Sequence, residues 1–361
     1  MSKTISRTTS IYLDLLRAAS AVLVFSIHIR NFLLPELRYA MYGSEAVAVF
    51  FVLSGYVIGF TIENKHTDLR SFLAARISRI YPVAILAILV TWIVDTIGWS
   101  ANPQHYLGLA THFFARSSHG FGALAFLQSF TFTNQIWFSH AVWGSGEPYW
   151  ALGFEVPYYF AAALLVHLKG GARWFWIAVW CLICGPVLAM FLPLWLFGAV
   201  CQRLVSRDLA RSGWIALATF VAACWLLVRL VKSGAINPVS AIYLNPTPLI
   251  AWHNFLYFSM IGVCAGLSVV AVDRVCGTRN LCPVWVEKAI RWVAGGSFTL
   301  YLVHQPLAML ASVFVRVGRD GLASRALGAA AVFAVAMALA EVAERRRNLY
   351  APVIERWLNK T

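Results

Sequence analysis

Long apolar segments recur along the whole chain, and they constrain its fold more than any other feature. Hydrophobic residues make up 60% of the 361 residues and charged residues only 12%, whereas about 25% of the residues of a soluble globular domain are charged. The mean hydropathy is +0.70. About 20 consecutive apolar residues are enough to cross a bilayer as a helix. The sequence therefore predicts an all-α fold, a polytopic bundle of transmembrane helices.

We predict about ten spans in a single integral-membrane domain that covers residues 1–361. They lie at residues 11–34, 44–62, 79–99, 150–168, 173–190, 191–205, 213–231, 250–272, 297–316 and 326–343. The fifth and sixth come from one apolar stretch interrupted at Pro193, where the chain either reverses or kinks. The apolar run after the N-terminal MSKTISRTTS continues past His28 without an evident cleavage site, so we interpret it as an uncleaved first span.

The distribution of basic residues predicts that both termini are cytoplasmic. With the N-terminus inside, most Lys and Arg residues fall in inside segments, as the positive-inside rule requires. An even number of spans returns the basic tail at 345–347 to the same side. The weak point is one short outer loop that holds Arg316, Arg319 and Arg325. Basic loops explain the formal net charge of +14, and no basic-aromatic strand or zinc-finger pattern indicates nucleic-acid binding.

The longest connection, at about 100–149, is predicted to be an extracytoplasmic loop. It contains His105, His112 and His119, which recur every seven residues and would share one face of a helix. No acid or cysteine accompanies them, so we predict no metal site. The loop either packs on the membrane surface or serves as a lid or acceptor-binding segment, because long ordered loops often carry function.

The stretch from Asp14 to His28 carries ionisable residues through the first span. Arg17 and His28 are eleven positions apart, which places them on nearly the same helix face and roughly 16 Å apart along the axis. Asp14 lies one turn before Arg17 and can pair with it. Ionisable groups within a span are costly, which favours a functional site that faces the protein interior. The alternative is a buried ion pair that only fixes helix packing.

Two further motifs lie in the next spans. Ser54-Gly55 in FFVLSGYVIGF is a small pair of the kind that permits close helix packing, which we prefer to a nucleophilic role for Ser54. In FLAARISRIYP, Arg76 and Arg79 are three residues apart on one helical face. Two guanidinium groups suit phosphate binding, although they could equally be topology anchors.

The fourth and ninth predicted spans also carry polar residues. Glu155 lies within the apolar run PYWALGFEVPYYF and needs a partner, for which His28 is the candidate at comparable depth. Ser297, Tyr301 and His304 in SFTLYLVHQP are spaced i, i+4 and i+7 and form one polar stripe. The stripe either supports a site or binds the bundle together by interhelical hydrogen bonds.

In their order and spacing, LDLLRAASAVLVFSIH, FFVLSGYVI, FLAARISRIYP, WALGFE and LYLVHQP resemble the acyltransferase 3 family of multi-pass membrane O-acyltransferases, in its stand-alone form. The resemblance covers nearly the whole chain. The family's first-helix pair of arginine and histidine corresponds to Arg17 and His28, and its Arg-x-x-Arg to Arg76 and Arg79. The WSLxxE signature corresponds to residues 150–155, where Ala151 replaces the usual serine.

The resemblance implies transfer of an acyl group, most often acetyl, from cytoplasmic acyl-CoA to a hydroxyl of an extracytoplasmic carbohydrate. The acceptor would be O-antigen, exopolysaccharide or a glycolipid, and the location the bacterial inner membrane. Acyl-CoA would be a co-substrate, with no permanently bound cofactor. His28 would act as general base, oriented by Glu155 or another group. Arg17 would stabilise the oxyanion or a phosphate of the donor.

A second hypothesis is a secondary transporter or flippase, in which the arginine, histidine and glutamate form a proton relay or substrate site. The pattern that would best indicate such a transporter is a pair of broken helices in two similar halves of the chain. This pattern is missing from the sequence. A sensor or scaffold is a third and weaker hypothesis, since it does not predict a cluster of buried polar groups at the same depth in the membrane.

Overall fold

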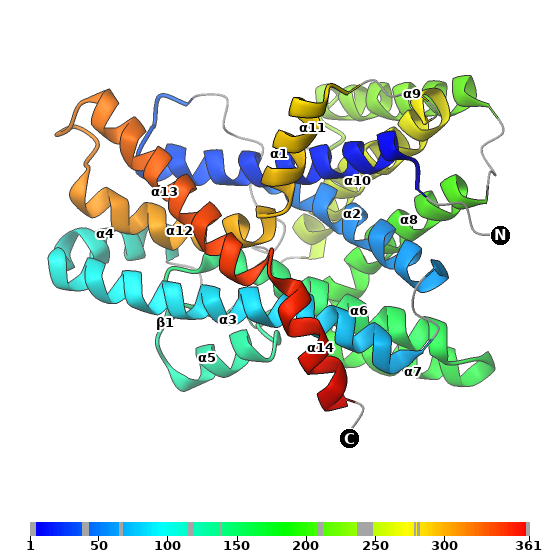
Figure 1. The fold of residues 1–361 in the computed structure, drawn as a ribbon, viewed down its shortest axis with the longest axis horizontal. Coiled ribbons are helices and arrows are strands. Elements are labelled where there is room, and N and C mark those ends of the chain that lie inside the picture. Colours follow the sequence, from blue (N-terminus) through cyan, green and yellow to red (C-terminus); the bar gives the residue numbers. More distant parts are fainter. Residues whose placement is uncertain are drawn as a thin grey trace. The chain divides into compact units, whose positions relative to one another are not determined.

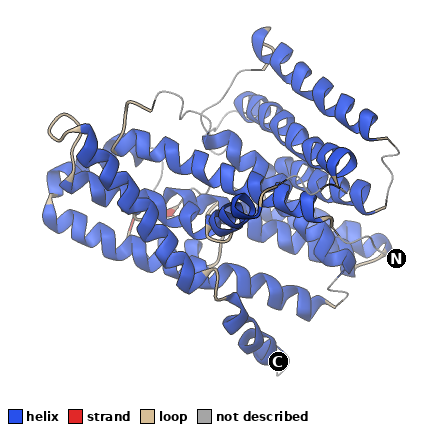
Figure 2. Cartoon of the chain, turned by 45° about the horizontal axis from the view of Figure 1, so that its top comes forward, coloured by secondary structure: helices blue, strands red, loops and turns tan. Residues whose placement is uncertain are grey.

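The computed structural model is almost entirely helical (Figure 2). It describes residues 5–37, 43–64, 68–114, 119–137, 139, 141–207, 212–236, 248–277, 279 and 282–358. The helices are α1 (Arg7–Phe32), α2 (Gly43–Asn64), α3 (Leu69–Ala101), α4 (Pro103–Phe114), α5 (Ala123–Phe130), the 3₁₀ helix η1 (Glu147–Ala151), α6 (Leu152–His167), α7 (Gly170–Cys184), α8 (Pro186–Ser206), α9 (Gly213–Lys232), α10 (Pro248–Cys276), α11 (Val284–Ala294), α12 (Ser297–Phe314), α13 (Leu322–Ala343) and α14 (Arg347–Leu358).

Within the described residues, nine helical segments are long and apolar enough to cross a membrane. They are α1, α2, α3, η1 with α6, α8, α9, most of α10, α12, and α13 continued into α14. Helix α7 is apolar but has only 15 residues. The prediction of an all-α, polytopic membrane bundle is confirmed, and the protein is a multi-pass membrane protein. The orientation of its termini stays a prediction.

The boundary between the fifth and sixth predicted spans was wrong. The chain breaks at Gly185, whose φ of +87° lies in the region that favours glycine, and α8 then begins at Pro186. Proline is favoured at the first position of a helix because its missing N–H has no partner there. Pro193 lies inside α8 and does not end it.

The connection at 100–149 contains local structure of its own. It holds α4, α5, η1, and two short parallel strands, β1 (His119–Gly120) and β2 (Val142–Trp143). Its extracytoplasmic position stays a prediction. Of the histidines in it, His140 and the side chains of His112 and His119 lie outside the described residues. The side chain of His105 is described, and its Nε2 lies 3.1 Å from Ser312 Oγ.

The chain forms two compact units, each described here by itself. The first unit comprises Met1–Ser20, Ser44–Leu69 and Phe160–Ala294, and the second comprises Ala21–Gly43, Arg70–Tyr159 and Gly295–Thr361. Helix α1 contributes to both.

In the first unit, α10 packs on α8 and α9 (Figure 1). Helices α2 and α8 approach so closely that only glycine fits at their contact. A Cβ on Gly55 would lie 1.8 Å from the Trp195 carbonyl oxygen, and one on Gly198 would lie 2.0 Å from that of Val52. The close helix packing predicted at this position is therefore found at Gly55. Tyr56 and Cys201 belong to the apolar core beside this contact.

In the second unit, α12 packs along α13 and also contacts α4 and η1 (Figure 1). Helix α12 is buried on almost all sides, which is typical of a helix at the centre of a bundle. Its apolar neighbours include Phe32 and Leu33 at the end of α1 and Val332 of α13. The core of this unit therefore brings α1 and α12 together.

Candidate functional site

Two histidines meet where α1 and α12 pack in the second unit. The ring centroids of His28 and His304 are 4.9 Å apart, in an edge-to-face arrangement. His304 is fully buried, and His28 is partly buried. Phe25, one turn before His28, contacts the His304 ring and also Phe333 of α13. The pair is therefore held by aromatic packing from two helices.

The hydrogen bonding of His304 fixes which of its nitrogens is basic. Its Nδ1 lies 2.9 Å from the Leu300 carbonyl oxygen. A carbonyl only accepts, so Nδ1 donates, and in the neutral ring Nε2 carries the lone pair. Nε2 is buried and has no hydrogen-bond partner among the described residues. A buried polar atom without a partner is costly, so Nε2 is a candidate for binding a substrate or transferring a proton.

Tyr301 extends the polar surface one turn along α12. It is 6% exposed, its ring centroid is 6.3 Å from that of His304, and its phenol lies within electrostatic range of Glu147 and Glu155. Gln305 donates from Nε2 to Glu147 Oε2 at 3.2 Å. The stripe predicted on this helix thus leads from the histidine pair to two carboxylates.

Glu155 lies among the polar residues of the second unit. The Tyr159 hydroxyl, one turn later on α6, donates to Glu155 Oε1. Arg79 of α3 lies within electrostatic range of Tyr159, Glu155 and Glu344. The sequence suggested that Glu155 orients His28. In the structure the ring in contact with His28 is that of His304, whereas Glu155 is bound by Tyr159.

Arg76 lies inside the continuous helix α3, seven residues after its start, rather than before a span. Its side chain is 7% exposed. The guanidinium carbon lies 5.7 Å from the ring centroid of Phe72 and 5.6 Å from that of Tyr159, which stabilises its charge by cation–π contact. Its Nε and Nη1 are buried without a hydrogen-bond partner among the described residues.

Glu344, directly after α13, binds the first turn of α12. Its carboxylate accepts from Thr299 N at 2.9 Å, Thr299 Oγ1 at 3.0 Å and Phe298 N at 3.4 Å. The first N–H groups of a helix have no partner within it, and its positive end favours an anion. Glu344 therefore fixes the end of α13 against the start of α12, where Ser297 is buried.

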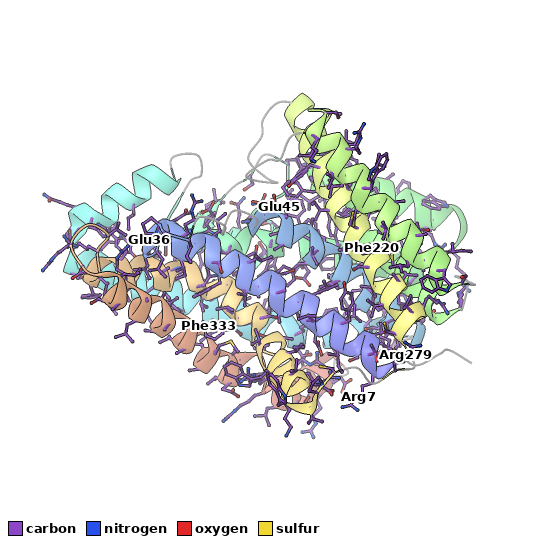
Figure 3. The ribbon with its side chains drawn as sticks, turned by 90° about the horizontal axis from the view of Figure 1, so that it is seen from above. Arg7, Glu36, Glu45, Phe220, Arg279 and Phe333 are labelled. Atoms are coloured by element: carbon purple, nitrogen blue, oxygen red, sulfur yellow. The ribbon has the colours of Figure 1, made fainter. Side chains whose placement is uncertain are left out.

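Asp14 and Arg17 fall in the first unit. They form the expected pair at 3.8 Å, but Asp14 is closer to Arg291 of α11, at 2.8 Å. Arg291 also binds Glu287, whose second partner is Arg7 at 2.5 Å. Figure 3 labels Arg7 at the start of α1. The acid of the first helix thus belongs to a small ion-pair network.

Ser54 lies on α2 in the first unit, beside the close contact with α8. Together with Asp14 and Arg17, it belongs to a different compact unit from the other candidate residues. His28, Glu155, Arg76, Arg79, Ser297, Tyr301 and His304 all fall in the second unit.

A buried carboxylate shapes the segment before η1. Asp95 of α3 is 2% exposed. It accepts from the Tyr106 hydroxyl at 2.6 Å, from Ser145 N at 2.8 Å and from Ser145 Oγ at 2.5 Å. Burial, and then the charge of Asp95, raise the pKa of Tyr106, so this phenol stays protonated and donates. Asp95 thus positions the chain two residues before Glu147.

Sequence reasoning missed Glu147, Tyr159, Glu344 and Arg347, the last of which lies within electrostatic range of Arg76 and Arg79. Each lies near a residue that was found, but the connection depends on how helices pack. Glu344 and Arg347 were interpreted as part of a basic cytoplasmic tail. A usable signal was Glu344, the acid that directly precedes the run of three arginines in EVAERRRNLY.

The described residues contain no group of three or more His, Cys, Asp or Glu side chains that could hold a metal ion. The chemistry available among them is that of imidazole, carboxylate, phenol and guanidinium groups. Such groups can transfer a proton, bind a phosphate and stabilise an oxyanion.

Comparison with known proteins identifies a family. The profile of a family described as an acyltransferase domain, acyltransferase 3, matches residues 10–341, nearly the whole chain. Searches of curated proteins and of solved structures found no match.

Proposed function

The chain belongs to the acyltransferase 3 family, and from this we propose that it moves an acetyl group from acetyl-CoA to a hydroxyl of a carbohydrate. The donor is cytoplasmic, and the acceptor is an extracytoplasmic glycan such as O-antigen, exopolysaccharide or a glycolipid. The protein lies in a bacterial inner membrane. The family and the membrane spans support the general activity; the donor, the acceptor and the location are part of the proposal.

The observation that carries the proposal is the contact between His28 and His304. Imidazole is the side chain best suited to accept a proton at neutral pH. The contact brings the first-helix histidine to a second ring whose Nε2 is buried and has no hydrogen-bond partner among the described residues. A structural histidine pair would be expected to use its buried nitrogens in hydrogen bonds within the protein.

In the proposed reaction, His28 removes the proton from the acceptor hydroxyl as its oxygen attacks the thioester carbonyl. The carbon–sulfur bond then breaks, the acyl group remains on the acceptor, and the thiolate leaves as the thiol after it takes up the proton. His304 orients the His28 ring by edge-to-face contact. Arg17 stabilises the oxyanion or a donor phosphate, the role that the family resemblance implies for it.

Arg76 and Arg79 bind phosphate groups of the donor. Two features support this assignment: the unpartnered Nε and Nη1 of Arg76, and the fork geometry of guanidinium, which matches phosphate oxygens. Tyr159 supports both arginines, since it contacts Arg76 by cation–π interaction and lies within electrostatic range of Arg79.

The test is acyl transfer by the purified full chain in lipid nanodiscs. Acetyl-CoA labelled in the acetyl group is supplied with a panel of lipid-linked and soluble glycans, and the product is identified by mass spectrometry. We expect label in an ester on the glycan and release of free thiol at the same rate. Export of unmodified glycan, with no labelled ester from any acceptor, would instead support a transporter.

A further inference from the structure

A third arginine lies near Arg76 and Arg79. Arg347 is the first residue of α14, and it lies within electrostatic range of both Arg76 and Arg79. Like charges placed together repel one another. Arg76 is buried and Arg347 is exposed, and an anion bound between them would offset this repulsion.

The acids in this region do not remove the need for an anion. Arg79 lies near the carboxylates of Glu155 and Glu344. The charges found to act on Arg76 come from Tyr159, Arg79 and Arg347, and two of these are cations. Arg76 is also more than nine-tenths buried, with Nε and Nη1 unpartnered among the described residues. A buried guanidinium with two vacant donors is suited to phosphate oxygens.

The position of Arg347 within its helix also favours an anion site. A helix N-terminus favours anions, and acidic residues are preferred in the first turn. Helix α14 has no acid in its first turn and begins with Arg347 instead. Glu344, three residues earlier, holds this turn against the start of α12 through the backbone N–H groups of Phe298 and Thr299. The location of Arg347 is thus fixed by hydrogen bonds, not only by the basic composition of the tail.

We propose that Arg347 completes, with Arg76 and Arg79, an anion site for a phosphate group, and that the C-terminal helix α14 is part of the donor-binding machinery. The inference rests on the proposed function for the identity of the ligand, a phosphate of acyl-CoA. The site itself requires only a phosphate-bearing molecule. Arg347 is here a binding residue that sets the affinity for the donor.

The experiment measures binding of four probes to the purified full chain by isothermal titration calorimetry. The probes are CoA, 3′-dephospho-CoA, inorganic pyrophosphate and pantetheine, which carries no phosphate. The test variants are Arg347→Ala and Arg347→Lys. The matched control is Arg346→Ala, which removes the adjacent arginine; both Arg346 and Arg347 are exposed.

We expect Arg347→Ala to weaken CoA binding about tenfold or more, as the loss of a charge-assisted contact to phosphate implies. Arg347→Lys should recover part of that affinity, because it restores the charge without the planar fork. Arg346→Ala should change CoA affinity less than about twofold. Pantetheine should bind equally to all variants. The loss in 3′-dephospho-CoA affinity tells whether the 3′-phosphate or the diphosphate occupies the site.

Two results would overturn the inference: unchanged CoA and pyrophosphate affinity in Arg347→Ala, or equal losses in Arg347→Ala and Arg346→Ala. If Arg347→Ala does not fold, as judged by its melting curve, the Arg347→Lys variant decides, since unchanged CoA and pyrophosphate affinity there also contradicts the inference. The proposed function can fail separately. If pyrophosphate binding depends on Arg347 while no acyl ester forms, the anion site stands and the assignment as a carbohydrate acyltransferase fails.

Discussion

The two compact units use ionisable side chains in different ways. In the first unit, acids bind several donors at once: Glu63 receives Gln202 and Ser206 as hydrogen-bond donors and pairs with Arg203 at 3.3 Å. In the second unit, His304 Nε2 and two nitrogens of Arg76 are buried without a hydrogen-bond partner among the described residues. A buried group that lacks a partner costs free energy. The first unit also holds buried polar atoms without a hydrogen-bond partner among the described residues, such as Glu45 Oε2. What distinguishes the second unit is that its unpartnered nitrogens belong to predicted site residues, His304 and Arg76.

The largest expected effect is at His28. Replacement by alanine removes the proposed base, and general-base catalysis typically contributes about 10²- to 10⁴-fold. We expect His28→Ala to lower acyl transfer by at least about 100-fold while the melting temperature changes little. The matched control is Ser26→Ala on the same helix, whose hydroxyl donates locally to the Val22 carbonyl oxygen at 2.7 Å. Near-normal turnover by His28→Ala would remove this histidine from the chemistry.

The next effect tests the packing of the first unit. A Cβ at Gly55 would meet the Trp195 carbonyl oxygen at 1.8 Å, so α2 and α8 must separate. We expect Gly55→Ala to lower the free energy of unfolding by about 3 kcal/mol, measured by denaturation in detergent. Gly171→Ala on α7, where a Cβ meets nothing within 4 Å, should be neutral or stabilising by up to about 1 kcal/mol. Equal stability of the two variants would contradict the close contact.

A substitution of Asp95 tests whether a buried acid of the second unit has a purely structural role. Asn in its place puts an amide N–H₂ where the acid accepts from Ser145 and Tyr106. We expect Asp95→Asn to cost about 1–3 kcal/mol of stability and to lower acyl transfer through the displacement of Glu147. Thr96→Ala, which loses only a local hydroxyl bond, should leave both unchanged. Full stability with lost activity would show that Asp95 acts in the reaction.

The smallest effect concerns Glu36, at the end of α1 (Figure 3). Arg325 donates to both of its carboxylate oxygens, at 2.6 and 3.2 Å. This hydrogen bonding lowers the pKa of Glu36 from its ordinary value of 4.5. The pair therefore stabilises the fold fully above that value and less as the pH falls through the lowered pKa. Glu36→Gln should melt slightly earlier than wild type at pH 7, and the two curves should converge once the pH falls below the lowered pKa of Glu36. A difference that persists in acid would mean that the ion pair is not its cause.

Much of the fold could be predicted because the length and apolarity of each span are visible in the sequence of that span alone. The Gly185 break was missed, although Gly-Pro is a strong local signal for the end of one helix and the start of another. The predicted boundary was placed at Pro193 instead, but proline is tolerated inside a membrane helix and need not end it.

The candidate site could be predicted in part. His28 and the stripe from Ser297 to His304 follow from polar residues within apolar helices. Which ring meets His28 could not be predicted, because that depends on the packing of α1 against α12. The proposed role of Arg347 could not be predicted for another reason. A basic tail has the same composition whether it anchors the topology or binds a ligand.

The contact between His28 and His304 is tested most directly by a double-mutant cycle on acyl transfer. Turnover is measured for wild type, His28→Ala, His304→Ala and the double variant, each checked for folding by its melting temperature. If the two rings act as one unit, the double variant should be no slower than the slower single variant, because residues that act together are strongly non-additive. Losses that multiply across the cycle would show independent roles and contradict the central claim.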